Sequence, residues 1–202
     1  MLKKFGKSFT MELKRKQMGM KHMEAIQFLL DEMNLNDVVT AEEYAKEYDQ
    51  ILESNYPNAK ALPSAQKLVE HLTKHGIETA ICTGSCSRTF ALKAAKHRDW
   101  VDLVPIQVLT GDDPNVKKGK PAPDGFLYTM SKFEKAPESS KNVLVFEDAP
   151  NGVEAALAAN MQCVMVPDPQ VFVPDNDFKK RVDLILNSLE EFLPESFGLP
   201  PY

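Results

Sequence analysis

The chain has 202 residues, 43% of them hydrophobic, which is enough for one domain with a hydrophobic core and a small additional lobe. Its formal net charge of −5 leaves no overall basic excess for binding nucleic acid. No apolar run approaches the roughly 18 residues that a membrane span needs, and no signal-peptide core follows Met1. The three cysteines are typical of reduced thiols. We therefore expect a cytoplasmic protein with neither membrane nor nucleic-acid partners.

The first 60 residues have the pattern of a helical lobe. Residues 1–23 are rich in lysine, which favours a solvated helix face over a transit peptide, because transit peptides prefer Arg and Ser. Apolar residues at helical spacing follow between Met23 and Met33, and Asn34 is a plausible stop. Thr40 with Glu43 is a capping box that predicts a second helix. The breaker-rich stretch 57–63 is expected to be the hinge.

From residue 61 to residue 202 the pattern alternates between helix and strand. Short apolar runs predict strands at 77–83, 101–109, 143–146, 163–166 and 184–186. Helical patterns separate them at 63–75, 90–96, through 126–130, and at 152–159, with a last short helix at 189–193. Strands separated by helices indicate right-handed crossovers. The predicted fold is therefore α/β: a doubly wound, Rossmann-like parallel sheet with helices on both faces, plus a small helical cap.

Two adjacent acids, Glu147 and Asp148, follow the apolar strand at 143–146. Asn151 and Glu154 form a possible capping pair for the alanine-rich helix that comes next. Because ligands of parallel sheets bind beyond the carboxyl ends of the strands, this is a candidate site for a hard cation or an anion. The alternative is that both are ordinary loop acids beside a helix start.

Two other strand ends or loops carry suitable polar residues. Thr83-Gly84-Ser85 ends the first strand, and a hydroxyl followed by glycine lets side chain and backbone N–H groups hold a phosphate oxygen, although the same tripeptide is common in turns. Lys120 lies before Pro121 and Pro123, which stiffen the backbone that aims its ammonium group. Lys117 and Lys118 lack such prolines and are interpreted as surface residues.

A hydroxyl residue, a lysine and a pair of acids follow one another along the chain as Thr83, Lys120 and Glu147-Asp148. In this order they resemble the second, third and fourth motifs of the haloacid dehalogenase-like hydrolases. The run 147–156, the Gly-Asp-Asp-Pro segment at 111–114 and the tail 197–202 resemble the pseudouridine-5′-phosphatase branch. The resemblance covers essentially the whole chain. It identifies residues 1–60 with the family's small cap, whose substrate-facing turn would be Gln17-Met18-Gly19.

The resemblance implies hydrolysis of a small phosphomonoester, pseudouridine 5′-phosphate or a similar nucleotide or sugar phosphate, through an aspartyl-phosphate and with Mg²⁺. It implies that Thr83, Gly84, Ser85 and Lys120 bind the phosphate. Thr83 and Lys120 would also be the catalytic residues, and Lys120 would offset the transferring charge. Asp148 would bind Mg²⁺ with help from Glu147. We expect a monomer.

The family's first motif, an apolar strand ending in Asp-x-Asp-Gly, has no counterpart near the start of these residues. Asp175-Asn-Asp177 is interpreted as a surface loop, because Pro174 interrupts the preceding strand and Phe178 replaces the required glycine. The resemblance thus implies a truncated or inactive form without significant turnover. In that family the first strand lies centrally in the sheet, so its absence would leave two strand edges unpaired.

Three alternatives are open from the sequence. One is a non-catalytic, phosphate-binding regulatory isoform. Another is a sugar-phosphate mutase or a dehalogenase on the same scaffold. The last is a doubly wound domain without a phosphate site.

Overall fold

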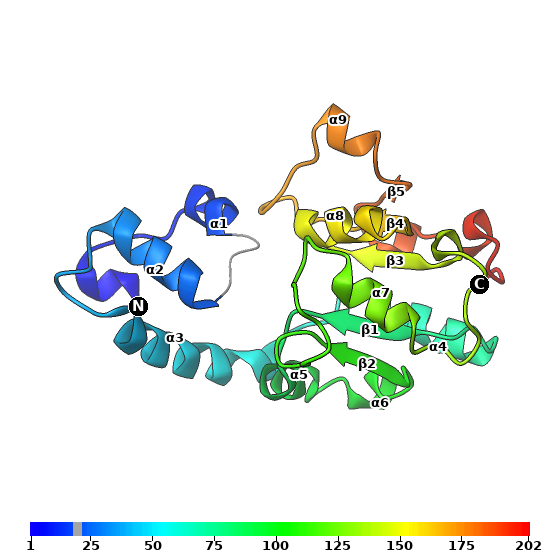
Figure 1. Ribbon diagram of the computed structural model, residues 1–202, viewed down its shortest axis with the longest axis horizontal. Helices are drawn as coiled ribbons and strands as arrows, with labels where there is room; N and C mark the ends of the chain where they lie inside the picture. Colours follow the sequence, from blue (N-terminus) through cyan, green and yellow to red (C-terminus); the bar gives the residue numbers. More distant parts are fainter. Residues whose placement is uncertain (18–21) are drawn as a thin grey trace.

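The computed structural model describes residues 1–17 and 22–202, and it comprises a helical lobe and a larger α/β part (Figure 1). Helix α3 runs from the lobe towards the α/β part (Figure 1). The elements of the lobe and of the link that follows are η1 (Leu2–Phe5), α1 (Met11–Gln17), α2 (His22–Met33), α3 (Ala41–Asn55) and η2 (Tyr56–Asn58).

The lobe has a small core of its own. Ile26, Leu29 and Leu30 of α2 are buried with exposed fractions of 4%, 5% and 0%, as the helical spacing predicts. Met23 belongs to the same predicted face but is exposed, because it lies in the first turn of α2. The Thr40–Glu43 capping box is confirmed: Glu43 N donates to Thr40 Oγ1 at 3.2 Å, and Thr40 N donates to Glu43 Oε2 at 3.1 Å.

Helices and strands alternate in the α/β part as predicted, with shorter strands than the apolar runs suggested. Residues 101–104 are a correction, because Val101 ends helix α6 and the strand begins only at Ile106. The helices are α4 (Ala65–Lys74), α5 (Ser87–Ala94), α6 (Arg98–Val101), α7 (Asp124–Met130), α8 (Pro150–Ala158) and α9 (Asn176–Lys179). The strands are β1 (Ala80–Thr83), β2 (Ile106–Leu109), β3 (Leu144–Glu147), β4 (Gln162–Met165) and β5 (Leu184–Ile185). The 3₁₀ turns are η3 (Ser140–Asn142), η4 (Leu189–Glu191) and η5 (Pro194–Phe197).

In the described residues the strands form two parallel sheets rather than one continuous sheet. β1 pairs with β2, and separately the order β3-β4-β5 forms the second sheet. β1 and β3 are therefore edge strands of their sheets. Both point in the same direction, with their carboxyl ends at one rim (Figure 1).

Alternate residues of the second sheet face different helical layers, as the period of a strand requires. Val145, Cys163 and Met165 pack in one cluster with residues of α7 and α8. Val164 and the partly buried Leu144 and Phe146 pack in another cluster with Leu68 and Leu72 of α4. Helices thus lie on both faces, and the predicted α/β class is confirmed.

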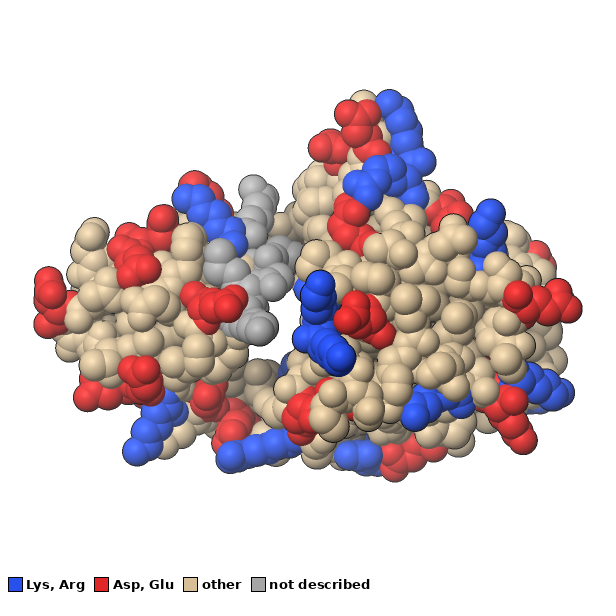
Figure 2. Space-filling model, viewed as in Figure 1, with Lys and Arg blue, Asp and Glu red and all other residues tan. Residues whose placement is uncertain are grey.

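Two surface features complete the fold. The segment 175–177 is not a plain loop: Asp175 caps the single-turn helix α9 by accepting from Phe178 N at 2.8 Å. Basic and acidic side chains are interspersed over the face shown in Figure 2, without a continuous basic area. No described helix is both long and apolar enough to cross a bilayer.

Candidate active site

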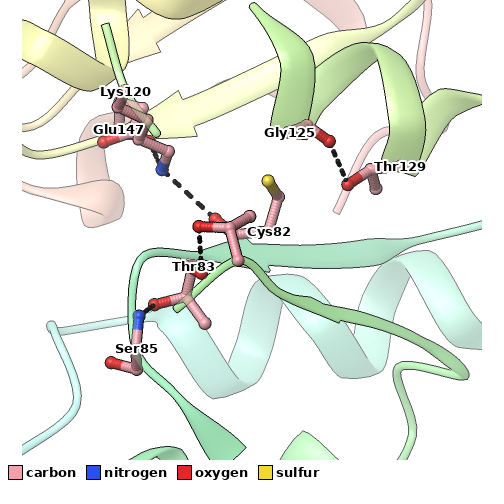
Figure 3. A network of polar contacts seen from close by, with 8 residues as sticks. Cys82, Thr83, Ser85, Lys120, Gly125, Thr129 and Glu147 are labelled. Carbon is pink, nitrogen blue, oxygen red and sulfur yellow. Dashed lines mark hydrogen bonds and ion pairs between the residues drawn. The ribbon is translucent and has the colours of Figure 1, made fainter. Parts of the chain in front are cut away.

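Thr83 is the last residue of β1 and begins a tight turn. Its carbonyl accepts from Thr110 N at 2.8 Å, which anchors it to the strand end of β2. Its side-chain Oγ1 accepts from Ser85 N at 3.2 Å (Figure 3). This local bond fixes the Thr83-Gly84-Ser85 turn. A Cβ on Gly84 would meet nothing within 4 Å, so the turn has open space beside its glycine.

Lys120 joins the other two motifs. Its Nζ donates to the carbonyl of Cys82 at 3.2 Å and forms an ion pair with Glu147 Oε1 (Figure 3). The side chains of Lys120 and Glu147 are only 19% and 8% exposed. The residue before Thr83 and the last residue of β3 are therefore bridged by one ammonium group. The structure brings the second, third and fourth motifs together at one rim.

Glu147 is a buried carboxylate in this arrangement. Burial raises its pKa above the ordinary value, and the Lys120 ammonium offsets part of that rise. Its carboxyl group lies against Gly152 of α8, where an added Cβ would overlap it. Gly152 thus permits the close approach of the acid to the helix.

Asp148 is exposed at the same rim, one residue beyond the strand. Mg²⁺ is commonly held by one or two carboxylates together with waters and substrate phosphate oxygens, and an exposed carboxylate suits that donor set. Glu147 is engaged with Lys120, so it is less available for the metal than the sequence predicted. Among the described residues, no group of three or more His, Cys, Asp and Glu could hold a metal ion. Asp148 is thus a single exposed carboxylate that would suit a Mg²⁺ held otherwise by water and phosphate.

The start of α8 differs from the predicted capping pair. Ala149 is the N-cap without a side-chain hydrogen bond, and Pro150 occupies the first turn. Proline is favoured there because its missing N–H has no helical partner to lose. Glu154 does not cap the helix and instead pairs with Arg181, with Oε1 2.8 Å from Nη1.

Sequence reasoning missed two side chains near the turn: Lys93, which contacts Ser85, and Asp112, which contacts Ser87 at the start of α5. Both Asp112 carboxylate oxygens accept from Ser87 N, at 2.9 and 3.1 Å, and so cap α5 from a distant loop. Lys93 Nζ donates to Ser85 Oγ at 3.0 Å, and burial lowers the pKa of Lys93. The Gly-Asp-Asp sequence could have pointed to Asp112. It places Asp112 directly after Gly111, where a Cβ would lie 2.5 Å from Cys86 N, so glycine lets this loop approach the start of α5.

We expect Asp112→Ala to destabilise the fold by about 1 kcal/mol, because α5 loses its N-terminal cap. Urea unfolding followed by far-UV circular dichroism measures this change. Asp113→Ala is the matched control, since the Asp113 side chain accepts within its own loop, from Asn115 N at 2.9 Å and from Asn115 Nδ2 at 3.0 Å. An equal loss in both variants would contradict the capping role of Asp112.

A cavity of about 910 Å³ lies in the helical lobe, away from this rim. Its lining is mainly apolar and includes Ile26, Tyr44 and Tyr48. Gln17 also lines it and donates to Ala25 O at 2.6 Å. Of the predicted substrate-facing turn, only Gln17 is described; Met18 and Gly19 lie outside the described residues.

The fold is shared with solved structures. The structure is similar to a haloacid dehalogenase hydrolase of family IA from Entamoeba histolytica, with a TM-score of 0.73 and 22% identity, covering 97% of this chain and 85% of that one. It is also similar to a β-phosphoglucomutase from Clostridium difficile, with a TM-score of 0.72 and 20% identity, covering 96% and 82% of the two chains. At such identities the likeness concerns the fold alone.

Sequence comparison identifies the family. Residues 5–160 match the haloacid dehalogenase-like hydrolases. The chain is 42% identical over 201 residues to (DL)-glycerol-3-phosphatase 2 of Arabidopsis thaliana, covering all of this chain and 82% of the relative. It is 36% identical to a probable pseudouridine-5′-phosphatase of Drosophila melanogaster, covering 84% of that protein. The chain belongs to the haloacid dehalogenase-like hydrolase family, and its relatives make it a phosphoric monoester hydrolase by family.

Proposed function

We propose that the rim formed by Thr83, Lys120 and Asp148 binds a small phosphomonoester together with Mg²⁺. The observation that supports this most directly is the Lys120 bridge, because one ammonium group contacts Cys82 O beside the Thr83 turn and also Glu147 beside Asp148. Three groups that suit phosphate and metal are thereby held at neighbouring strand ends. Residues 1–60, as a cap, would select the substrate.

Each residue has a defined role in this proposal. The Thr83 hydroxyl and the N–H groups of Gly84 and Ser85 would hold phosphate oxygens, and Lys120 would offset negative charge. Asp148 would hold Mg²⁺, with Glu147 keeping Lys120 in place. When bound, Mg²⁺ would polarise the phosphoryl group.

The names of two relatives support the substrate class that we propose. A glycerol phosphatase at 42% identity and a probable pseudouridine phosphatase at 36% both act, by their names, on small polar phosphomonoesters. We propose glycerol 3-phosphate or a nucleoside 5′-monophosphate such as pseudouridine 5′-phosphate.

Calorimetric titration with glycerol 3-phosphate and pseudouridine 5′-phosphate, with and without Mg²⁺, tests this function. We expect Thr83→Val to weaken binding by about tenfold or more, because a hydrogen bond to a charged group contributes about 1.5–3 kcal/mol. Asp148→Asn should remove the dependence of binding on Mg²⁺. Lys117→Met, at an exposed lysine in the same loop, is the control and should bind as the parent does.

Absence of phosphomonoester binding by the folded chain would contradict the proposal, because the rim would then hold no phosphate.

A further inference from the structure

Lys93 is a half-buried cation beside the Thr83–Ser85 turn. Its Nζ donates to Ser85 Oγ at 3.0 Å and lies 4.8 Å from the centroid of the Tyr56 ring. Burial lowers the pKa of Lys93, and the neighbouring Cys86 thiol offsets part of that shift. Within residues 1–17 and 22–202, none of the ion pairs involves Lys93. Because buried charges in proteins are normally paired, this ammonium group indicates that an anion binds nearby.

The hydrogen bond from Lys93 restricts what the Ser85 hydroxyl can do. A serine hydroxyl has one hydrogen to donate and two lone pairs that accept, whereas an ammonium group can only donate. Lys93 therefore occupies a lone pair of Ser85 Oγ and leaves the hydroxyl hydrogen for another acceptor. The same holds for Thr83, because Ser85 N donates to Thr83 Oγ1 at 3.2 Å (Figure 3). Both hydroxyl groups of the turn are thus free to donate, as binding of phosphate oxygens requires.

The charge of Lys93 also makes the Ser85 hydroxyl a stronger donor. A hydrogen bond accepted from a cation polarises the hydroxyl group, and successive hydrogen bonds strengthen one another in a partly buried site. Lys120 differs in this respect, because its ammonium group is paired with the carboxylate of Glu147. Lys93 therefore adds a positive charge that no ion pair within the described residues neutralises.

The contacts of α5 with the link to the lobe hold Lys93 in place. α5 packs against η2, which contributes the Tyr56 ring beside the Lys93 ammonium. Shortly after the end of α5, Lys96 Nζ donates to Asn58 Oδ1 at 2.9 Å. The stem of Lys93 is fixed by the helix and its tip by the ring, so its bond to Ser85 is preorganised.

We propose that Lys93 is a positioning residue of the candidate active site, which orients and polarises the Ser85 hydroxyl so that this group donates to a phosphate oxygen. Lys93 acts through Ser85 and does not itself contact the phosphate. This inference rests on the proposed function and adds the Ser85 hydroxyl to the phosphate donors named there.

Calorimetric titration with glycerol 3-phosphate and with pseudouridine 5′-phosphate, each with Mg²⁺, tests this role. We expect Lys93→Met to weaken binding by about three- to tenfold, the range expected for one net hydrogen bond. Lys93→Arg should stay within about twofold of the parent, because a guanidinium group also donates and stacks on an aromatic ring. Lys96→Met removes an equal charge that contacts the link but not the turn, so it is the control and should bind as the parent does.

A double-mutant cycle with Ser85→Ala shows whether Lys93 acts through this hydroxyl. In the Ser85→Ala background, Lys93→Met should cause no further loss of binding. An equal loss in both backgrounds would overturn the proposal, because the lysine would then act by its charge alone. Circular dichroism checks that each variant is folded, and Lys93→Ala gives the same test should Lys93→Met not fold.

Failure of this inference differs from failure of the proposed function. If the parent binds either phosphomonoester and folded Lys93→Met binds it equally well, the positioning role of Lys93 is wrong and the proposed function stands. If the parent binds neither compound, the proposed function is wrong and this inference falls with it.

Discussion

Lys120→Met is expected to destabilise the protein by about 3–5 kcal/mol, because it leaves the carboxylate of Glu147 buried without its cation. Glu147 is 8% exposed, and Lys120 is its ion-pair partner. Methionine has a similar length, so little packing is lost. Urea unfolding with the linear extrapolation measures the change in the free energy of unfolding.

Two controls separate charge from packing in this prediction. Lys180→Met removes an exposed ion pair with Asp177, whose side chains are 75% and 91% exposed, and it should change stability by less than about 0.5 kcal/mol. The double variant Lys120→Met/Glu147→Gln removes the stranded charge and should recover a large part of the loss. A double variant no more stable than Lys120→Met would assign the loss to packing instead.

The stability loss of Lys120→Met should also depend on pH. The pKa of Glu147 is raised by burial, so its protonation stabilises the folded state; that contribution is full below the ordinary value of 4.5 and is lost as pH rises through the folded pKa. Without the Lys120 ammonium, the folded pKa lies higher still. The difference between the parent and Lys120→Met should therefore shrink as the pH falls towards 4.5, and a constant difference would contradict this role for Glu147.

The sequence predicted the order of elements and the α/β class because those depend on local patterns. Thr40 and Glu43 lie three residues apart, so their capping box could be read directly. The strand limits were less accurate: Val101 is apolar enough for a strand, yet Asp99 and Trp100 join it in a helical turn. Helices bury apolar residues just as strands do. A run of apolar residues can therefore include the end of a neighbouring helix, and the predicted strand is then too long.

The sequence could propose the members of the candidate site, but it could not predict the contacts between them. Thr83, Lys120 and Glu147 meet at one rim because parallel strands end together. The pairing of Lys120 with Glu147 depends on side chains 27 residues apart, and the capping of α5 by Asp112 depends on residues 25 apart. No local spacing encodes such contacts. Asn151 is the opposite case, because its local spacing predicted a helix cap that the structure does not have. Helix α8 begins at Pro150, and its N-cap Ala149 makes no side-chain hydrogen bond.

Gly152→Ala is expected to destabilise the fold by about 1–3 kcal/mol, because the new methyl group overlaps the Glu147 carboxyl group and forces the buried ion pair apart. The sign is decisive, since glycine to alanine within a helix normally stabilises by about 0.5–1 kcal/mol. Gly119→Ala, where a Cβ would meet nothing within 4 Å, is the control and should change stability little.

The cause of that loss can be isolated in a background without the carboxyl group. In Glu147→Ala the space beside α8 is open, so adding Gly152→Ala should become neutral or stabilising, as helix propensity requires. Thermal unfolding of the four proteins completes the double-mutant cycle. If Gly152→Ala destabilises both backgrounds equally, the overlap with Glu147 is not its cause, and the close approach of β3 to the start of α8 must be explained by the backbone alone.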